Sequence, residues 1–219
     1  MFDTSLLAAV WAGASGRVGR DEVLAARERG AVAGLAAATA GTEPTTISWF
    51  GERLLAATAD LDGMGRPLFA ALRALDLPDD AHGRAWRAAE LVREHRGDGH
   101  LAACVAAGLT TAEANVLTEL WLGYPIGGYS SSRGLGADGQ QRAVDALRAR
   151  GWIDDAGDLT AVGREARDEV EAATDRSQDA LITALGDDVE AVIAAGVELS
   201  ERILAARSTP ADPRKRAAG

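Results

Sequence analysis

Two of the three histidines in the chain lie close together, in the segment His95–His100 with the sequence HRGDGH. Imidazole groups titrate near neutral pH, so both histidines can exchange protons or hydrogen bonds with a ligand. The arginine between them can hold an anionic group through two parallel hydrogen bonds. We therefore predict a small-molecule site at this segment. Its residues are His95, Arg96, Asp98 and His100, with Trp86 and Trp121 as walls of a cavity.

The same segment also fits a purely structural role. Asp98 can accept hydrogen bonds from the free N–H groups of a helix that begins at Gly99. Arg93 or Arg96 can pair with nearby carboxylates at helical spacing. The segment would then be a capped junction between two apolar helices, with a buried network of arginines and carboxylates.

A metal site is the third interpretation of this segment. His100 and Cys104 are four residues apart, and therefore share one face of a helix. His95 or a glutamate supplies a third ligand only if the helix breaks at Gly97–Gly99. Because Cys104 lies in a run of alanine, valine and leucine, we interpret it as a core thiol and predict no metal.

A second group of polar residues lies in residues 133–150, which contain four arginines. A helix over Ala137–Arg150 that buries Val144 and Leu147 would expose Asp138, Gln141, Arg142, Asp145 and Arg148. Arginine and glutamine side chains suit the edges of guanine and adenine in the major groove, and arginines also bind phosphates. We therefore predict contacts with duplex DNA through Arg133, Gln141, Arg142 and Arg148, with Arg150 as a further phosphate contact.

The residues after this helix argue against DNA. Trp152–Ile153 and Leu159–Thr160 flank the tight turn Asp154–Asp158, which predicts a small two-stranded hairpin. The turn has three aspartates and no lysine or arginine, so its tip would repel phosphates. Residues 160–206 continue this trend, with 11 acidic residues against 4 arginines.

The elements that must position these groups are predicted to be helices throughout, separated by short segments rich in glycine and proline. The helices are expected at Asp21–Ala40, Thr45–Leu61, Pro67–Leu75, Ala81–His95, Gly99–Ala107, Thr110–Trp121, Ala137–Arg150, Leu159–Leu185 and Asp187–Ala206. Thr110 and Glu113 have the spacing of a capping box. The glycine- and serine-rich residues 123–139 are interpreted as a long, flexible loop.

Composition limits the classes of protein that remain. The net charge of −10 excludes coating of nucleic acid by bulk charge, although a local basic face stays possible. The single cysteine excludes an internal disulfide framework. No apolar run reaches the roughly 20 residues of a membrane span, and the first residues lack the pattern of a signal peptide. We expect a cytoplasmic protein with no membrane partner, no catalytic motif and no cofactor.

Two short phrases in the second half carry a resemblance. Leu147–Ile153 (LRARGWI) followed by Leu159–Arg164 (LTAVGR) resembles the end of the recognition helix and the return of the wing in the multiple-antibiotic-resistance regulator (MarR) superfamily. Residues 65–68, 86–92, 93–100 and 171–176 also resemble a little-characterised family of bacterial winged-helix-like proteins, without that family's additional N-terminal segment. The resemblance implies an all-α chain with a winged helix-turn-helix module and a short two-stranded wing.

The resemblance sets the predicted organisation and function. We expect a helical N-terminal part over residues 1–96, the winged module with its C-terminal helices over residues 97–207, and a disordered tail over residues 208–219. The long final helices resemble the dimerisation arms of the superfamily, so a homodimer is expected. The predicted function is a MarR-like DNA-binding transcriptional regulator that responds to an unidentified small molecule, bound between the two parts near His95–His100.

Two alternatives remain open. The same scaffold can bind, sequester or process a small molecule near His95–His100 without binding DNA. It can also be a protein-interaction module with no ligand. The DNA-binding hypothesis requires that the helix ending at Arg150 exposes its polar face.

Overall fold

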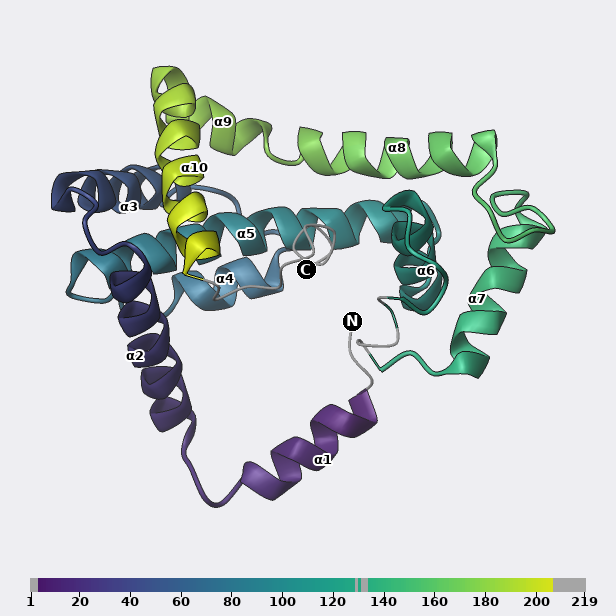
Figure 1. Ribbon diagram of the computed structural model, residues 1–219, viewed down its shortest axis with the longest axis horizontal. Coiled ribbons are helices and arrows are strands. Elements are labelled where there is room, and N and C mark those ends of the chain that lie inside the picture. The colour runs from purple at the N-terminus through teal and green to yellow at the C-terminus, as the bar shows by residue number, and fades with distance from the viewer. Residues whose placement is uncertain (1–3, 129, 131–133, 207–219) are drawn as a thin grey trace. The chain divides into compact units, whose positions relative to one another are not determined.

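A computed structural model describes residues 4–128, 130 and 134–206 (Figure 1). Arg133 and the tail over residues 208–219, both subjects of predictions above, lie outside the described residues. The described chain is helical, as expected. Its elements are α1 (Thr4–Ala14), α2 (Arg20–Ala38), α3 (Pro44–Thr58), α4 (Pro67–Arg73), α5 (Ala81–Ala106), α6 (Thr111–Trp121), α7 (Ala137–Ala149), α8 (Ala161–Arg176), α9 (Asp179–Leu185), the 3₁₀ helix η2 (Gly186–Asp188) and α10 (Val189–Ala205).

The described chain divides into two compact units. Residues 20–99 and 174–206 form one, here called the α3–α5 unit, and residues 4–19 and 100–173 form the other, the α6–α7 unit. The division falls inside α5 and α8, so each of these helices contributes residues to both units.

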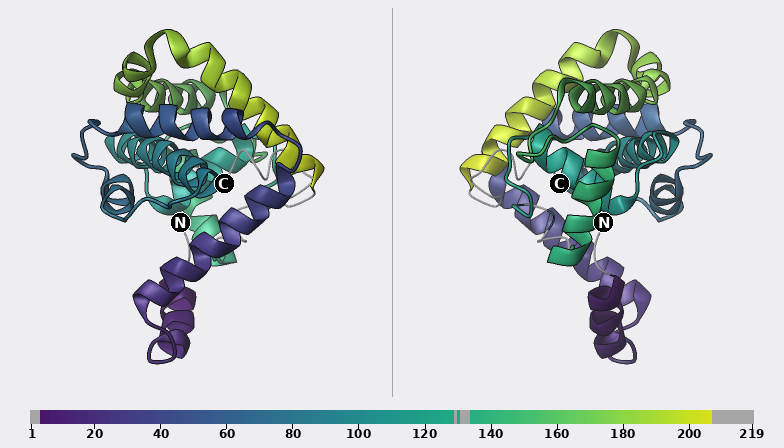
Figure 2. Two further views of the ribbon diagram at one scale, coloured as in Figure 1. Left: turned by 90° about the vertical axis from the view of Figure 1, so that its left-hand side faces the viewer. Right: turned by 90° about the vertical axis from the view of Figure 1, so that its right-hand side faces the viewer.

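Helices α3, α4, α5, α9 and α10 lie together in the α3–α5 unit (Figure 2). They share an apolar core, and Ile47, Ala85 and Leu199 form a second, smaller cluster. Pro44 and Pro67 stand in the first turns of α3 and α4, where a missing N–H costs nothing. Gly51 allows close packing of α3 on α5, because a Cβ there would lie 2.9 Å from the Ala85 backbone. The buried members of the core are Leu54, Ala57, Leu61, Phe69, Ala88, Leu91, Leu181, Leu185 and Val192.

The α6–α7 unit has a separate core. Val116 and Leu117 of α6 and Val144 and Leu147 of α7 are buried together, as the helical spacing predicted for α7. The capping box is also confirmed: the Glu113 N–H donates to Thr110 Oγ1 (3.3 Å), and the Thr110 N–H donates to the Glu113 carboxylate (2.7 Å). α6 therefore begins where expected, and its apolar face holds α7.

Three expectations about elements are wrong. The predicted two-stranded wing is a turn: residues 150–160 contain no strand, and Ile153 and Leu159 form one isolated antiparallel bridge. The predicted break at Gly97–Gly99 is absent, because α5 runs unbroken through both glycines. The predicted helix Leu159–Leu185 is two helices, α8 and α9.

No single helix among the described residues is long and apolar enough to cross a membrane. α5 and α6 taken together have the length and composition of a membrane span, but they are bent by 106° at the break between them.

Candidate nucleic-acid interface

α7 has one buried face and one exposed polar face. Ala143, Val144 and Leu147 point into the core of the α6–α7 unit. Gln141 and Arg142 lie on the opposite face and are exposed. The exposed residues Asp138, Gln141, Arg142 and Asp145 follow the three- and four-residue spacing of a single helical stripe, so one approaching surface can meet all of them.

Asp145 lies at the centre of a hydrogen-bonded group on this stripe. Its Oδ1 accepts from Gln141 Nε2 (2.9 Å) and from Arg148 Nη1 (3.4 Å). Arg148 also donates through Nε to the Asp154 carbonyl oxygen (3.3 Å) and lies 3.9 Å from the Asp155 carboxylate. Arg148 therefore joins α7 to the turn Asp154–Asp158, here called the acidic turn. The charge of Arg148 is partly neutralised within the chain.

The other two arginines of this region differ in their surroundings. Arg142 is exposed, and within the described part of the chain no hydrogen bond or ion pair engages its guanidinium. Arg150 is occupied: it donates to the carbonyls of Ala107 and Gly108 (3.3 and 2.7 Å) and stacks on Trp152, 4.7 Å from the ring centre. Arg150 thus satisfies carbonyl groups at the end of α5, a structural role that the sequence did not indicate.

Residues Leu159–Arg164 (LTAVGR) form the connection that leads into α8. Thr160 Oγ1 accepts from the Gly163 N–H (3.0 Å) and caps α8. The Trp152 carbonyl accepts from the Thr160 N–H (3.0 Å) and lies so close to Gly163 that a Cβ there would be 2.2 Å from it. Threonine and glycine therefore close the turn between α7 and α8 tightly, and fix the acidic turn beside α7.

Glu119 of α6 holds the loop that leads to α7. This side chain is fully buried, and its carboxylate accepts from the Gly127 N–H (3.1 Å), the Ser130 N–H and the Ser130 hydroxyl (3.1 Å). Gln140 of α7 donates to the same hydroxyl (3.3 Å). At these points the loop is fixed to both helices, whereas its composition predicted flexibility. A glutamate in an amphipathic helix is usually exposed, so no signal in the sequence indicated this role.

Inside the HRGDGH segment, His95 and Asp98 belong to a buried network of the α3–α5 unit. Asp98 Oδ2 accepts from the N–H groups of Leu68 and Phe69 (both 3.0 Å), and so caps α4 rather than a helix beginning at Gly99. His95 Nδ1 lies 2.8 Å from Gln178 Oε1, and Arg66 donates to the His95 carbonyl oxygen. These contacts favour the structural interpretation for His95 and Asp98.

Two further residues of the predicted small-molecule site, Arg96 and Trp86, contact residues outside that buried network. Arg96 forms an exposed ion pair with Asp175 (3.6 Å). The guanidinium groups of Arg27 and Arg87 both contact the Trp86 ring, 5.0 and 5.5 Å from its centre. Since α5 is continuous, His95 and His100 are turned about 140° apart around its axis.

His100 and Trp121 belong to the α6–α7 unit. His100 lies 3.6 Å from the Cys104 sulfur and 4.0 Å from the Glu171 carboxylate, and burial raises the pKa of the Cys104 thiol. Trp121 donates to Asp168 (3.2 Å) and carries Arg167 over its ring (4.4 Å). Over the described part of the chain, no three histidine, cysteine or acidic side chains are grouped so that they could hold a metal ion.

The position of His95 predicts a dependence of stability on pH. Burial lowers the pKa of His95 below its ordinary value, and the hydrogen bond to Gln178 opposes this only in part. The unfolded chain therefore takes up the proton first, and the free energy of unfolding falls as the pH drops below about 6.5. Urea unfolding at a series of pH values should show a steeper loss for the wild type than for H95Q. Equal slopes would contradict the buried neutral imidazole.

The two glycines of the segment should respond oppositely to alanine. At Gly97 a Cβ meets only the Glu94 carboxylate at 3.7 Å, so G97A should stabilise α5 by up to about 1 kcal/mol through helix propensity. At Gly99 a Cβ would lie 2.3 Å from Ser177 Oγ and 2.9 Å from Arg66 Nη1, so G99A should destabilise the chain by about 1–3 kcal/mol. Urea unfolding of the two variants tests the sign of each effect; G99A as stable as G97A would refute the close contact.

Comparison with known families identifies the class of protein. The chain belongs to a helix-turn-helix family, whose family model matches residues 1–210. Comparison with curated proteins and with solved structures finds no match. The expectation of a helix-turn-helix protein is confirmed, and this membership suggests a DNA-binding regulator in general. The assignment to the MarR superfamily stays a prediction.

Proposed function

We propose that the chain is a transcriptional regulator that reads the major groove of duplex DNA with the exposed face of α7. Gln141 and Arg142 meet base edges, and Arg148 meets a phosphate. Arg133, outside the described residues, is proposed as a second phosphate contact. The observation that carries the proposal is the two-sided character of α7: its apolar face is buried in the core, while Gln141 and Arg142 are exposed.

The ion pairs of Arg148 define how DNA would be bound. A phosphate that approaches Arg148 competes with Asp145 and with the Asp154 carbonyl for the same guanidinium. The acidic turn beside α7 adds repulsion. Because few phosphate contacts remain, we expect the affinity for DNA of arbitrary sequence to be low. Base contacts by Gln141 and Arg142 would then determine the affinity for a preferred sequence.

We also propose that the regulator is a homodimer. α10 exposes Ile193, Val197 and Leu204 on the described chain, at 54, 52 and 37% of their full accessibility. An apolar helix face of this kind is stabilised when a second copy covers it. A two-fold dimer would present two copies of α7 to successive turns of the duplex. Light scattering on the full chain at tens of micromolar should give twice the mass of 22.7 kDa.

The intramolecular contacts of the arginines, together with the acidic turn, support a second function. Arg148 and Arg150 are both engaged within the chain, and the turn beside α7 is acidic. A scaffold that binds a small molecule and no DNA would have this pattern. In that case α7 would be a protein surface without a nucleic-acid partner.

Fluorescence anisotropy of a labelled duplex separates the two functions. At about 20 mM salt the full chain should bind a duplex of arbitrary sequence, because phosphate contacts are strongest there. With about two phosphate contacts from each copy of a dimer, the slope of log affinity against log salt should be near −3 to −4. Absence of binding at low salt would overturn the regulator and leave the small-molecule scaffold.

A further inference from the structure

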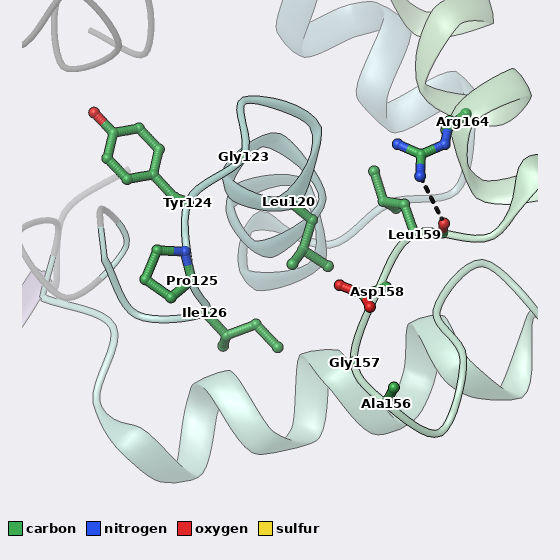
Figure 3. Close-up of a pocket in the computed structure, with 10 residues that line it drawn as sticks. All are labelled: Leu120, Gly123, Tyr124, Pro125, Ile126, Ala156, Gly157, Asp158, Leu159 and Arg164. Atoms are coloured by element: carbon green, nitrogen blue, oxygen red, sulfur yellow. Dashed lines mark hydrogen bonds between the residues drawn. The ribbon is translucent and has the colours of Figure 1, made fainter.

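A pocket opens between the end of α6 and the acidic turn, entirely within the α6–α7 unit (Figure 3). Its volume of about 570 Å³ is in the range of small-molecule sites. It is distinct from the HRGDGH segment, which contributes no residue to it. The residues that line the pocket are Leu120, Gly123, Tyr124, Pro125, Ile126, Ala156, Gly157, Asp158, Leu159 and Arg164.

One side of the pocket is apolar. Leu120 of α6 and Ile126 of the loop point toward Asp158 (Figure 3), and Leu159, which belongs to the buried core, also lines the pocket. Hydrogen bonds fix this wall: the Tyr124 N–H donates to the Glu119 carbonyl oxygen (2.8 Å), and the Glu119 carboxylate holds Gly127. An apolar group of a ligand would therefore meet a wall that is already in place.

The pocket also carries two charges of opposite sign that do not neutralise each other. Asp158 and Arg164 are both exposed and form no ion pair with each other. The Asp158 carboxylate points toward Leu120 and Ile126, while the Arg164 guanidinium lies beyond Leu159 and donates to its carbonyl oxygen (3.2 Å) (Figure 3). Both side chains line the pocket and keep hydrogen-bonding capacity for a ligand, since a guanidinium has five N–H donors and a carboxylate four acceptor positions.

We propose that this pocket binds a free apolar α-amino acid. Its ammonium group pairs with Asp158, its carboxylate with Arg164, and its side chain covers Leu120 and Ile126. A ligand with a single charge would satisfy one of the two side chains and face repulsion from the other. A ligand with both charges on an apolar body uses every chemical feature of the pocket.

Binding at this pocket would bear on the proposed DNA contact. Ala156–Leu159 belong to the turn whose Asp154 carbonyl holds Arg148 of α7. A ligand that fixes the turn also fixes that carbonyl, and changes the competition between the turn and a phosphate for Arg148. This regulatory consequence rests on the proposed function, whereas the pocket itself can be tested without DNA.

Isothermal titration calorimetry without DNA tests the pocket with three probes that share one benzyl body: L-phenylalanine, 2-phenylethylamine and 3-phenylpropionate. L-leucine serves as a second amino acid. The amino acids should bind at least about tenfold more tightly than the two singly charged analogues, because each analogue lacks one ion pair. Binding of 2-phenylethylamine as tight as that of L-phenylalanine would overturn the proposal, as would no heat from either amino acid at about 1 mM.

Variants of the two charged residues assign the groups. D158N should weaken binding of L-phenylalanine about tenfold and should not weaken 3-phenylpropionate, whose repulsion from Asp158 it removes. R164Q should weaken L-phenylalanine and should not weaken 2-phenylethylamine, whose repulsion from Arg164 it removes. D155N is the matched control, because Asp155 lies in the same turn with a fully exposed side chain outside the pocket. Wild-type affinity in D155N supports the assignment, and an equal loss in D155N and D158N would overturn it. Because neither aspartate side chain is buried, D158N is expected to fold like the wild type, which circular dichroism would verify.

Discussion

The R142A variant should lose roughly 5- to 150-fold in affinity for a preferred DNA site, while its stability stays at the wild-type value. A bidentate contact of arginine with guanine contributes about 1–3 kcal/mol to discrimination between bases. Arg142 is exposed on α7 and has no described partner, so its removal leaves no buried group unsatisfied. Anisotropy against the preferred site and urea unfolding of the same preparation measure the two quantities.

R29A is the matched control for R142A. Arg29 is exposed on α2, in the α3–α5 unit, and its replacement changes the net charge by the same amount. A general electrostatic effect would lower affinity equally in both variants. Equal losses, or wild-type affinity in R142A, would contradict a base contact from α7.

The G163A variant should be destabilised by at least about 3 kcal/mol, the largest stability effect expected for a single methyl group in this chain. Helix propensity alone predicts the opposite sign, because Gly163 lies in the first turn of α8 and alanine is favoured over glycine in helices by about 1 kcal/mol. The added Cβ would lie 2.2 Å from the Trp152 carbonyl oxygen and 2.9 Å from its carbon. That carbonyl accepts from the Thr160 N–H, so it cannot move away without losing the bond.

G136A is the control for this effect. Gly136 precedes α7 with φ −70°, and a Cβ there meets no atom within 4 Å. Its replacement should change the free energy of unfolding by less than about 1 kcal/mol. Urea unfolding that finds G163A as stable as G136A would show that the turn between α7 and α8 is more open than described.

Local signals in the sequence predicted local structure well. The capping box at Thr110, the proline in the first turn of α4 and the inward face of α7 at Val144 and Leu147 are all confirmed. Each depends on contacts within a few residues, or on a periodicity of one helix, and so is encoded in neighbouring residues.

Long-range pairing explains what the sequence did not indicate. Gly97 and Gly99 suggested a helix break, but a Cβ at Gly99 would meet Ser177 and Arg66, residues that are distant in the chain. Asp98 likewise has the form of a cap for the next residue, yet it caps α4, thirty residues earlier. The residue type of a glycine or an aspartate indicates which kind of contact it can make. It does not identify the partner in that contact, because tertiary packing determines the partner.

The candidate interface shows the same limit. The spacing of α7 placed Gln141 and Arg142 on the exposed face, as the structure has them. The acidic composition of residues 154–158 was visible in the sequence, but the link from the Asp154 carbonyl to Arg148 was not. Whether an arginine is available to a phosphate depends on contacts that composition alone does not specify.

Photo-crosslinking from α7 tests the central claim most directly. A benzoylphenylalanine placed at position 141 of the full chain, with a second variant at position 29 as control, would be irradiated with duplex DNA at low salt. The account predicts covalent protein–DNA product from position 141 and none from position 29. Wild-type binding with no crosslink from position 141, or equal product from both positions, would contradict the reading of DNA by α7.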